Sequence, residues 1–332
     1  MLIGAPTATP YQLATIPTAG QDIWYDTVGV WLDHQSDLRG ANMAGGAGGE
    51  AGLWVRAVGD WTRRSQTSTY ADLNRSYAFD SGYRLDVGGI VGGFDADRHD
   101  VFGKGDVLVV GIGGGYIGST QNFHVGSTRG DYNGGSLEIT GAYLRQNFFV
   151  DGAVKADFLN ATISAPGAAP FGAGRASADL TNAGAIVDTG FRWGFGPGFV
   201  EPLVTLAYVN TSVVGLSLGG DGVSFGGGDN ARVRVGVSGG WTLSQWNNYI
   251  VEAAVTGSYW ARITGDASAT INSGVGAPLF TVNDQQVRDF GEIGASLDAT
   301  PLKNGVAGFL QFDYQFGAHY DAAQVKAGAR IA

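Results

Sequence analysis

The sequence predicts an all-β membrane protein, a 12-stranded antiparallel transmembrane β-barrel with an N-terminal α-helix in the pore. Three observations favour this fold class. Apolar and polar side chains alternate with period two along most of the chain. About twelve of the alternating segments are long enough to cross a bilayer at a tilt, and the connectors between them are alternately long and short.

The composition excludes several other classes of protein. The chain has 332 residues, and only 15% of them are charged, below the roughly 25% of a typical soluble domain. The net charge is −10 and no basic stripe is visible, so a nucleic-acid partner is not expected. The absence of cysteine excludes disulfide frameworks and thiolate metal sites. No apolar run reaches the roughly 20 residues of a transmembrane helix.

The alternation is clearest at 231–243, where Val233, Val235 and Val237 share one face of the predicted strand. Arg232 and Arg234 share the other face. Most of the alternating segments exceed the roughly 9–11 residues that a tilted strand needs to span a bilayer. Strands are therefore expected at 52–65, 82–96, 105–119, 135–147, 148–162, 177–194, 199–212, 230–243, 248–263, 286–299, 305–316 and 321–332.

The connectors indicate how the barrel is oriented. Short turns include Gln146–Asn147 and Pro301–Asn304, whereas 66–81, 213–229 and 264–285 are long. Outer-membrane barrels have short periplasmic turns and longer outside loops. The start of the first predicted strand and the end of the last one are therefore both expected on the periplasmic side.

Charged residues on the polar face are expected to line the lumen, because an Arg or Lys facing lipid at the midplane costs about 2–4 kcal/mol. Glycine in a strand often marks the close approach of another backbone, and a helix in the pore is such an approach. The charged lumen candidates are Arg56, Glu138, Asp188, Arg192, Arg232, Arg234, Glu252, Arg288 and Glu292. The proposed lumen glycines are Gly88, Gly92, Gly111, Gly113, Gly115, Gly184, Gly190, Gly236 and Gly240.

A helix is predicted at 21–40, with Asp22 as its N-cap and Gly40 as its stop. Its periodic part is about 27 Å long at roughly 1.5 Å per residue, close to the roughly 30 Å of a bilayer core. An amphipathic helix packed outside on the sheet is the alternative, but the lumen glycines and charges favour a plug. Its acidic residues would then face lumen arginines such as Arg232 and Arg234. The pore-helix candidates are Trp24, Asp26, Trp31, Asp33 and Asp37.

The helix divides the chain into four parts. Residues 1–20 are rich in Pro, Thr, Ala and Gly and are interpreted as a linker, and 41–51 as a Gly/Ala-rich connector. Residues 52–332 form the predicted barrel. The start of the chain lacks the basic and apolar regions of a signal peptide. An exported protein of this kind is therefore expected to be longer than this chain.

Several segments resemble the β-domain of autotransporters. GLWVRAVGDW at 52–61 resembles the opening strand after the pore helix, and YRLDVGGIVGGFDA at 83–96 resembles the Gly-containing second strand. FVEPLVTLAYV at 199–209 is similar to the Glu-Pro strand of the family. The chain ends in Ala332, whereas the family usually ends in an aromatic residue. Asn247–Asn248 is the only Asn pair and lies in a predicted turn, so cleavage of a passenger at an Asn pair within the helix is not expected.

The resemblance implies the C-terminal translocator domain of a type V secretion protein, integral to the bacterial outer membrane. Its implied partners are outer-membrane lipid, its own N-terminal passenger, which residues 1–20 would join to the barrel, and the barrel assembly machinery. A monomeric barrel is expected, with no cofactor, metal or catalytic site.

Three alternatives stay open at this point. One is a stand-alone, porin-like channel, which does not require a plug helix. Another is an outer-membrane hydrolase with its site on the loops. Gly215, Ser217 and Gly219 fit the G-x-S-x-G pattern, but that motif needs a strand-to-helix turn and no helix is predicted after it. The third alternative is a soluble all-β adhesin.

Overall fold

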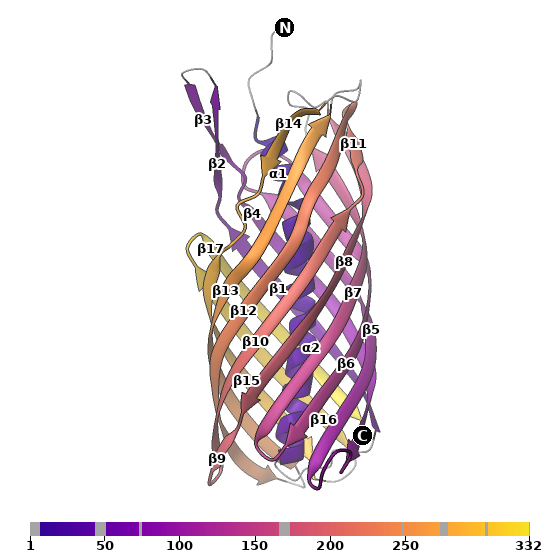
Figure 1. The fold of residues 1–332 in the computed structure, drawn as a ribbon, viewed down its shortest axis with the longest axis vertical. Helices are drawn as coiled ribbons and strands as arrows, with labels where there is room; N and C mark the ends of the chain where they lie inside the picture. Colours follow the sequence, from indigo (N-terminus) through magenta and orange to yellow (C-terminus); the bar gives the residue numbers. More distant parts are fainter. Residues whose placement is uncertain are drawn as a thin grey trace.

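Twelve long strands close into one antiparallel barrel (Figure 1). The computed structural model describes residues 7–43, 51–72, 75–165, 173–246, 249–272, 278–302 and 305–331. Each strand pairs with the next along the chain, and the last pairs with the first. The barrel strands are β1 (Ala51–Arg64), β4 (Tyr83–His99), β5 (Asp106–Phe123), β6 (Arg129–Arg145), β7 (Phe148–Ala165), β8 (Gly174–Phe191), β10 (Gly198–Val213), β12 (Asp221–Trp246), β13 (Tyr249–Asn272), β15 (Asp289–Pro301), β16 (Val306–Gly317) and β17 (Tyr320–Ile331).

The predicted number of barrel strands is confirmed, but several predicted long loops are partly strand. Strands β12 and β13 keep pairing from Gly222 and Asn272 down to Trp246 and Tyr249. Because of this extra length, the wall of the barrel extends well beyond the strand segments that were predicted to cross the bilayer. Short strands extend the edges or form a separate hairpin: β2 (Thr67–Asp72) with β3 (Arg75–Asp80), β9 (Trp193–Phe195), β11 (Leu216–Leu218) and β14 (Pro278–Asn283).

The two ends of the barrel differ. The connection at 146–147 and the β9 turn lie at one end, together with the start of β1 and the end of β17 (Figure 1). The β2–β3 hairpin, β11 and β14 lie at the other end. This asymmetry is the one predicted, with short turns on the periplasmic side and the longer connections outside.

The two faces of the wall also differ, as the alternation predicted. In β1 every second side chain is buried and the residues between them are exposed or half-buried. Outward-facing Leu53 and Val154 are 64% and 63% exposed, whereas inward-facing Arg56 and Lys155 are 2% and 1% exposed. The charged residues therefore line the interior, and apolar side chains cover the exterior.

Two of the proposed lumen glycines face outward instead. In β4 the inward residues are Val87 and Val91, and the outward residues are Ile90 and Phe94. Gly88 and Gly92 share the face of Ile90, so their prediction as lumen residues is wrong. The Gly88–Gly89 and Gly92–Gly93 pairs explain the error, because adjacent glycines offer no side chains that distinguish the two faces.

The N-terminal helix is longer than predicted. A short helix α1 (Thr9–Leu13) is followed by the 28-residue helix α2 (Ile16–Met43). At roughly 1.5 Å per residue, α2 spans about 42 Å. Much of the predicted linker 1–20 is therefore helical, and the predicted cap Asp22 and stop Gly40 both lie inside the helix. Pro17 fits the first turn of α2, where its missing N–H costs nothing.

None of the helices in the described ranges has the length and apolar character needed to cross a membrane.

Candidate functional site in the lumen

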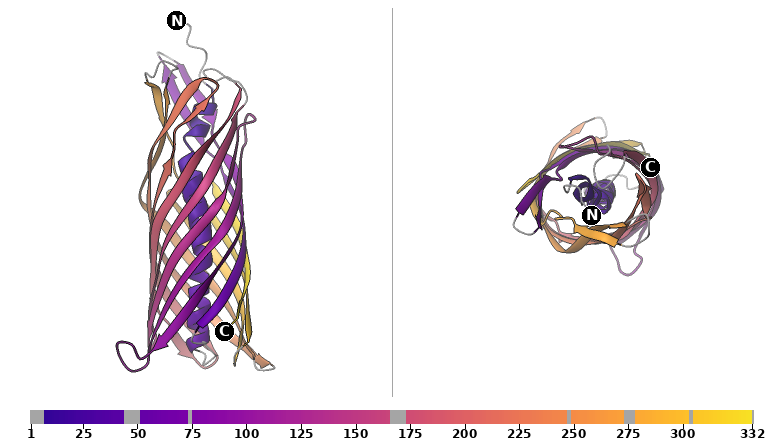
Figure 2. Two further views of the ribbon diagram at one scale, coloured as in Figure 1. Left: turned by 90° about the vertical axis from the view of Figure 1, so that its right-hand side faces the viewer. Right: turned by 90° about the horizontal axis from the view of Figure 1, so that it is seen from above.

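Helix α2 runs inside the barrel from the long-loop end to the short-turn end (Figure 2). It lies nearest to β4, β7, β8 and β10. Trp24 and Trp31, both predicted for the pore helix, are 0% and 1% exposed. The predicted pore location of the helix is therefore the one observed, and the alternative of a helix packed outside the sheet is wrong.

The upper part of the lumen is apolar. Both helices and the upper strands contribute buried side chains to one cluster, which we call the apolar collar. Leu13, Ile16 and Ile23 are at most 1% exposed, so the top of the helix is enclosed on several sides. The principal collar residues are Tyr11, Leu13, Ile16, Ile23, Tyr83, Leu85, Ile117, Tyr132, Leu159, Ala161, Ile163, Leu180, Leu216 and Leu218.

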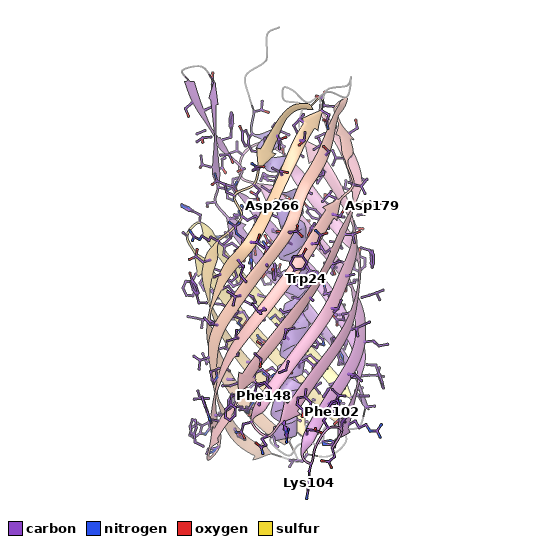
Figure 3. All side chains as sticks on the ribbon, in the orientation of Figure 1. Trp24, Phe102, Lys104, Phe148, Asp179 and Asp266 are labelled. Carbon is purple, nitrogen blue, oxygen red and sulfur yellow. The ribbon has the colours of Figure 1, made fainter. Side chains whose placement is uncertain are left out.

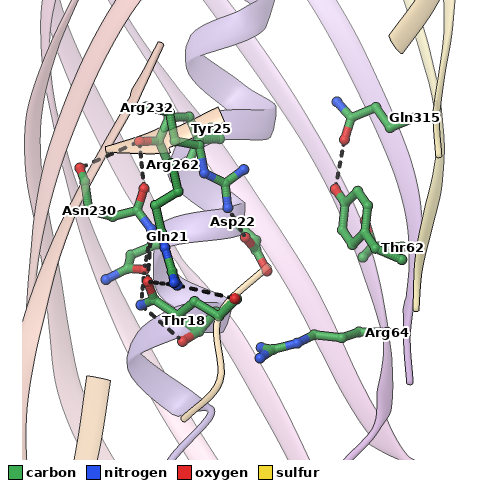
Figure 4. Close-up of polar contacts among 12 residues, drawn as sticks. Thr18, Gln21, Asp22, Tyr25, Thr62, Arg64, Asn230, Arg232, Arg262 and Gln315 are labelled. Atoms are coloured by element: carbon green, nitrogen blue, oxygen red, sulfur yellow. Dashed lines mark hydrogen bonds and ion pairs between the residues drawn. The ribbon is translucent and has the colours of Figure 1, made fainter. Parts of the chain in front are cut away.

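Residues 284–288, which we call the latch, follow β14 and reach the helix next to the collar. Asp284 accepts hydrogen bonds from Arg64 Nη1 and Nη2 at 3.0 and 2.9 Å and from the Thr18 hydroxyl at 2.6 Å. Gln286 Nε2 donates to Gln21 Oε1 at 2.8 Å. The latch therefore connects the wall to the first turns of α2. Figure 4 shows Thr18 and Gln21 in this network.

The Gln286 side chain also connects the helix to strands β12 and β13. Its Oε1 atom accepts hydrogen bonds from Asn230 Nδ2 at 3.0 Å and Arg262 Nη1 at 3.3 Å. The Tyr25 hydroxyl bonds Asn230 Oδ1 at 3.0 Å. Four segments distant in the sequence thus meet at one buried amide (Figure 4).

Trp24 packs closely against the wall. Its indole Nε1 donates to the backbone oxygen of Lys155 at 3.2 Å. A Cβ atom placed on Gly184 would lie 2.6 Å from Trp24 Cζ2. Gly184 is thus a lumen glycine that makes room for the helix, as predicted for this position. Figure 3 shows Trp24 within the barrel.

The acidic residues of the helix make ion pairs with the wall, mostly with bases other than those expected. Asp37 pairs with Arg56. Asp33 accepts a hydrogen bond from Lys326 Nζ at 2.5 Å. Asp22 lies 3.9 Å from Arg232, which is one of the two arginines expected to face the helix. Among the described residues Asp26 has no base within ion-pair distance.

The other charged lumen candidates mostly pair within the wall. Arg234 contacts Glu292 at 3.2 Å, and Arg192 contacts Glu252 at 2.8 Å. Asp188 accepts a hydrogen bond from the Thr205 hydroxyl at 2.6 Å. Glu138 is 4% exposed, and neither of its carboxylate oxygens has a hydrogen-bond partner among the described residues.

Arg288 differs from the prediction. It is exposed and precedes β15, which begins only at Asp289. Arg288 belongs to the latch, where the backbone leaves the strand, so the alternation of a strand does not apply to it. Arg288 is therefore not one of the buried charges that line the lumen.

Two lumen contacts of the helix were not predicted. Arg39 pairs with Asp151 and with Glu201, the latter at 2.7 Å, and its guanidinium lies 3.6 Å from the centre of the Phe149 ring. A basic residue late in the helix, with acidic inward positions on the wall, was the signal available for this pairing.

The second is His34. It is fully buried, its Nε2 atom lies 2.9 Å from Asp95 Oδ2, and its ring stacks on Trp54 at 4.4 Å. Arg330 in β17 also binds Asp95, at 2.7 Å. This group joins the helix to β1, β4 and β17, which form the seam of the barrel. The scattered histidines of the sequence gave no sign of it.

Two arrangements that the sequence raised can be checked against the described parts of the structure. No group of three or more His, Cys, Asp or Glu side chains there is arranged to hold a metal ion. Ser217 lies in the short strand β11, which continues into a turn and β12. This is not the strand-to-helix turn that a nucleophile elbow needs.

A closed barrel with an apolar exterior and a charged, helix-filled interior defines a transmembrane β-barrel of the outer-membrane type. A model of the autotransporter beta-domain matches residues 53–313. The chain belongs to the autotransporter beta-domain family. It is an outer-membrane translocator and anchor domain, and the family links such barrels to a passenger.

Solved structures show the same fold. The β domain of the Bordetella autotransporter BrkA matches with a TM-score of 0.63 and 16% identity over 86% of this chain and 100% of that one. The translocator domain of NalP from Neisseria meningitidis matches with a TM-score of 0.60 and 13% identity over 93% and 98%. The transport unit of AIDA-I from Escherichia coli matches with 0.60 and 13% over 84% and 90%. A comparison with curated proteins found no match.

Proposed function

We propose that the chain works as a monomeric barrel that holds its passenger at the cell surface through α2, which stays in the pore as a plug. The observation that carries this proposal is the direction of the helix. Its N-terminal end lies among the long loops, and its C-terminal end lies beside the start of β1 at the short turns (Figure 2). Any polypeptide joined before Thr9 is thereby directed to the outside.

Surface labelling tests this orientation. An epitope placed before Thr7 should bind antibody on intact cells. The same epitope inserted between Gln146 and Asn147, in a short turn, should bind antibody only after the outer membrane is permeabilised. Labelling of the second epitope on intact cells, or of neither, would contradict the proposal.

The plug itself is tested by conductance in planar bilayers. Removal of residues 7–43 should open a pore that the full chain lacks, because α2 fills the lumen along most of its length. An unchanged single-channel conductance would exclude the plug. The same recordings separate the anchor from a stand-alone channel, since a channel would conduct well with the helix present.

Insertion by the barrel assembly machinery and embedding in outer-membrane lipid form the second part of the proposal. Both are supported by membership in the family and by the apolar exterior. Depletion of the machinery should reduce the fraction of the chain that migrates as a folded, heat-sensitive band on gels. The mass of the detergent-solubilised barrel, measured by light scattering, should be that of one chain.

The proposal assigns the chain no catalytic activity. Support comes from the position of Ser217 in a strand. Hydrolysis of ester or peptide substrates by the refolded barrel, above that of a Ser217→Ala variant, would contradict it.

A further inference from the structure

The helix does not fill the lumen evenly. Two cavities lie beside α2, on the side away from β4 and β7. The lower one measures about 90 Å³ and the upper one about 70 Å³, and they share Leu32, Asp33 and Asp313 in their linings. A cavity needs roughly 10–15 Å³ for one water, so each has room for several. We call the two together the crevice.

A further cavity lies next to the crevice at the short-turn end. This third cavity of about 360 Å³ is lined by Gln146 and Asn147 of a short turn and shares Arg192, Phe199 and Glu252 with the lower cavity. At the opposite end the apolar collar and the latch pack around the helix above the upper cavity. Among the described residues, the cavities thus lie toward the short-turn end, and packed apolar side chains surround the helix toward the other end.

The crevice is rich in carboxylates. Seven line the lower cavity and five line the upper one, and Asp33 and Asp313 occur in both. Ten different carboxylates therefore face five basic residues. Ion pairs within the lumen neutralise some of them, but within the described ranges Asp26, Asp188 and Asp298 have no base within ion-pair distance.

Asp26 is the clearest case of an unpaired carboxyl group. It lines the upper cavity, is 8% exposed, and its Oδ2 atom has no hydrogen-bond partner among the described residues. Asp60 lies next to Asp26. Gln324 in β17 is directly opposite Asp60, and its side chain donates a hydrogen bond to the Asp26 backbone oxygen at 3.3 Å. The Oδ2 atom of Asp60 is also unpartnered. Buried carboxylates without a counter-charge are costly, and water or a cation in the crevice would relieve that cost.

We propose that the crevice is a water-filled site that takes up small cations from the periplasmic end, and that the apolar collar, not the charged part of the helix, seals the pore. The excess of carboxylates raises the local concentration of cations and excludes anions, as walls of one charge sign do in a narrow cleft. This inference goes beyond surface display, since a barrel that fails the test below could still present its passenger outside.

Cysteine labelling tests the proposal cleanly, because the chain has no cysteine of its own. Ser296→Cys places a thiol in the lower cavity, and Ala161→Cys places one in the collar. Ser127→Cys, in an exposed turn, is the reference. Each folded variant in detergent is treated with a cationic aminoethyl or an anionic sulfonatoethyl methanethiosulfonate, and the rates are divided by those of Ser127→Cys.

The normalised rate at Ser296→Cys should be about tenfold higher for the cationic reagent than for the anionic one, whereas Ala161→Cys should react with neither. The double change Asp26→Asn and Asp298→Asn should bring the two rates at Ser296→Cys together. Asp298→Asn alone should reduce the difference between the two rates in part. This single variant provides the test if the double variant does not fold. Asp179→Asn, exposed on the outer face and labelled in Figure 3, should leave the ratio unchanged.

Three other results would each contradict one part of the proposal. An unreactive Ser296→Cys would show that the crevice is not open to water. Equal rates for the two reagents, or a ratio that survives the loss of Asp298, would exclude the attraction of cations by these carboxylates. A reactive Ala161→Cys would show that the collar is not the seal.

Discussion

At the scale of single residues, Gly184 shows why the helix fits where it does. A Cβ atom there would lie 2.4 Å from the Tyr208 carbonyl oxygen and 2.6 Å from the Trp24 ring. Trp24 is fully buried and has no free space to turn away. The wall therefore needs a residue without a side chain opposite the tryptophan.

We expect Gly184→Ala to lower the free energy of unfolding by about 1–3 kcal/mol, the usual cost of overpacking. Urea unfolding of the barrel in detergent measures this change. Gly88→Ala is the matched control, because nothing lies within 4 Å of a Cβ atom at that position. Equal effects of the two variants would show that the contact with Trp24 is not what requires glycine.

The sequence predicts which lumen residues face inward better than it predicts their partners. Alternation places Arg56 and Arg234 on the inner face, and the structure agrees. It does not reveal that Arg56 binds Asp37 while Arg234 binds Glu292. Those pairings depend on the stagger of the strands and on the rotation of α2 about its axis, which no local pattern encodes.

At the scale of elements, strand number and location follow from alternation, whereas the start of α2 does not. Residues 9–20 contain Thr, Pro and Gly, which are poor helix formers in water. Their helical structure comes from burial: a fully buried Leu or Ile contributes about 1.5–3 kcal/mol, and Leu13 and Ile16 are enclosed by the collar. Because the collar is built from distant strands, its effect on 9–20 is invisible in a sequence window.

The latch should control the upper turns of α2. Gln286→Ala removes the amide that joins Gln21, Asn230 and Arg262, and buried polar groups left unpaired cost about 1–3 kcal/mol. We expect backbone amides in 16–24 to exchange with solvent about tenfold faster or more. Amides in 33–40 should be unchanged, because Asp33, Asp37 and Arg39 keep their ion pairs. Hydrogen exchange measured by mass spectrometry reports both regions.

Gln285→Ala is the control for this prediction, since the Gln285 side chain is exposed although it lies next to Gln286. It should leave exchange in both regions unaltered. Faster exchange throughout α2 in Gln286→Ala would mean that the latch holds the whole helix and not only its upper end.

At the scale of the whole molecule, the barrel depends on closure between its first and last strands. Strands β1 and β17 pair from Leu53 with Ile331 to Arg64 with Tyr320. Ala57 and Ala327 are direct partners on the outer face, and directly opposite Cα atoms lie about 4.5–5.5 Å apart. A disulfide spans this distance. Oxidation of an Ala57→Cys, Ala327→Cys double variant should therefore crosslink the seam, which shifts its mobility on non-reducing gels after heating.

The same experiment with Ala57→Cys and Ala323→Cys should give no crosslink. Ala323 is opposite Trp61, four residues along the strand from Ala57, or about 13 Å. Crosslinking of this second pair would indicate a shifted register at the seam. Crosslinking of neither pair would indicate an open barrel.

The apolar exterior should behave as a band that meets lipid, with a polar rim above it. On the outer face of β7, Val154 is 63% exposed and Phe158 is 55% exposed, and the next outward residue is the polar Asn160. An arginine facing lipid near the midplane costs about 2–4 kcal/mol, and one near the interface about 0–1 kcal/mol. Val154→Arg should therefore lower the free energy of unfolding in lipid vesicles by the larger amount, and Asn160→Arg, on the same strand and face, by the smaller one. Equal costs would place both residues at the same depth, and the boundary of the band would then not lie between Phe158 and Asn160.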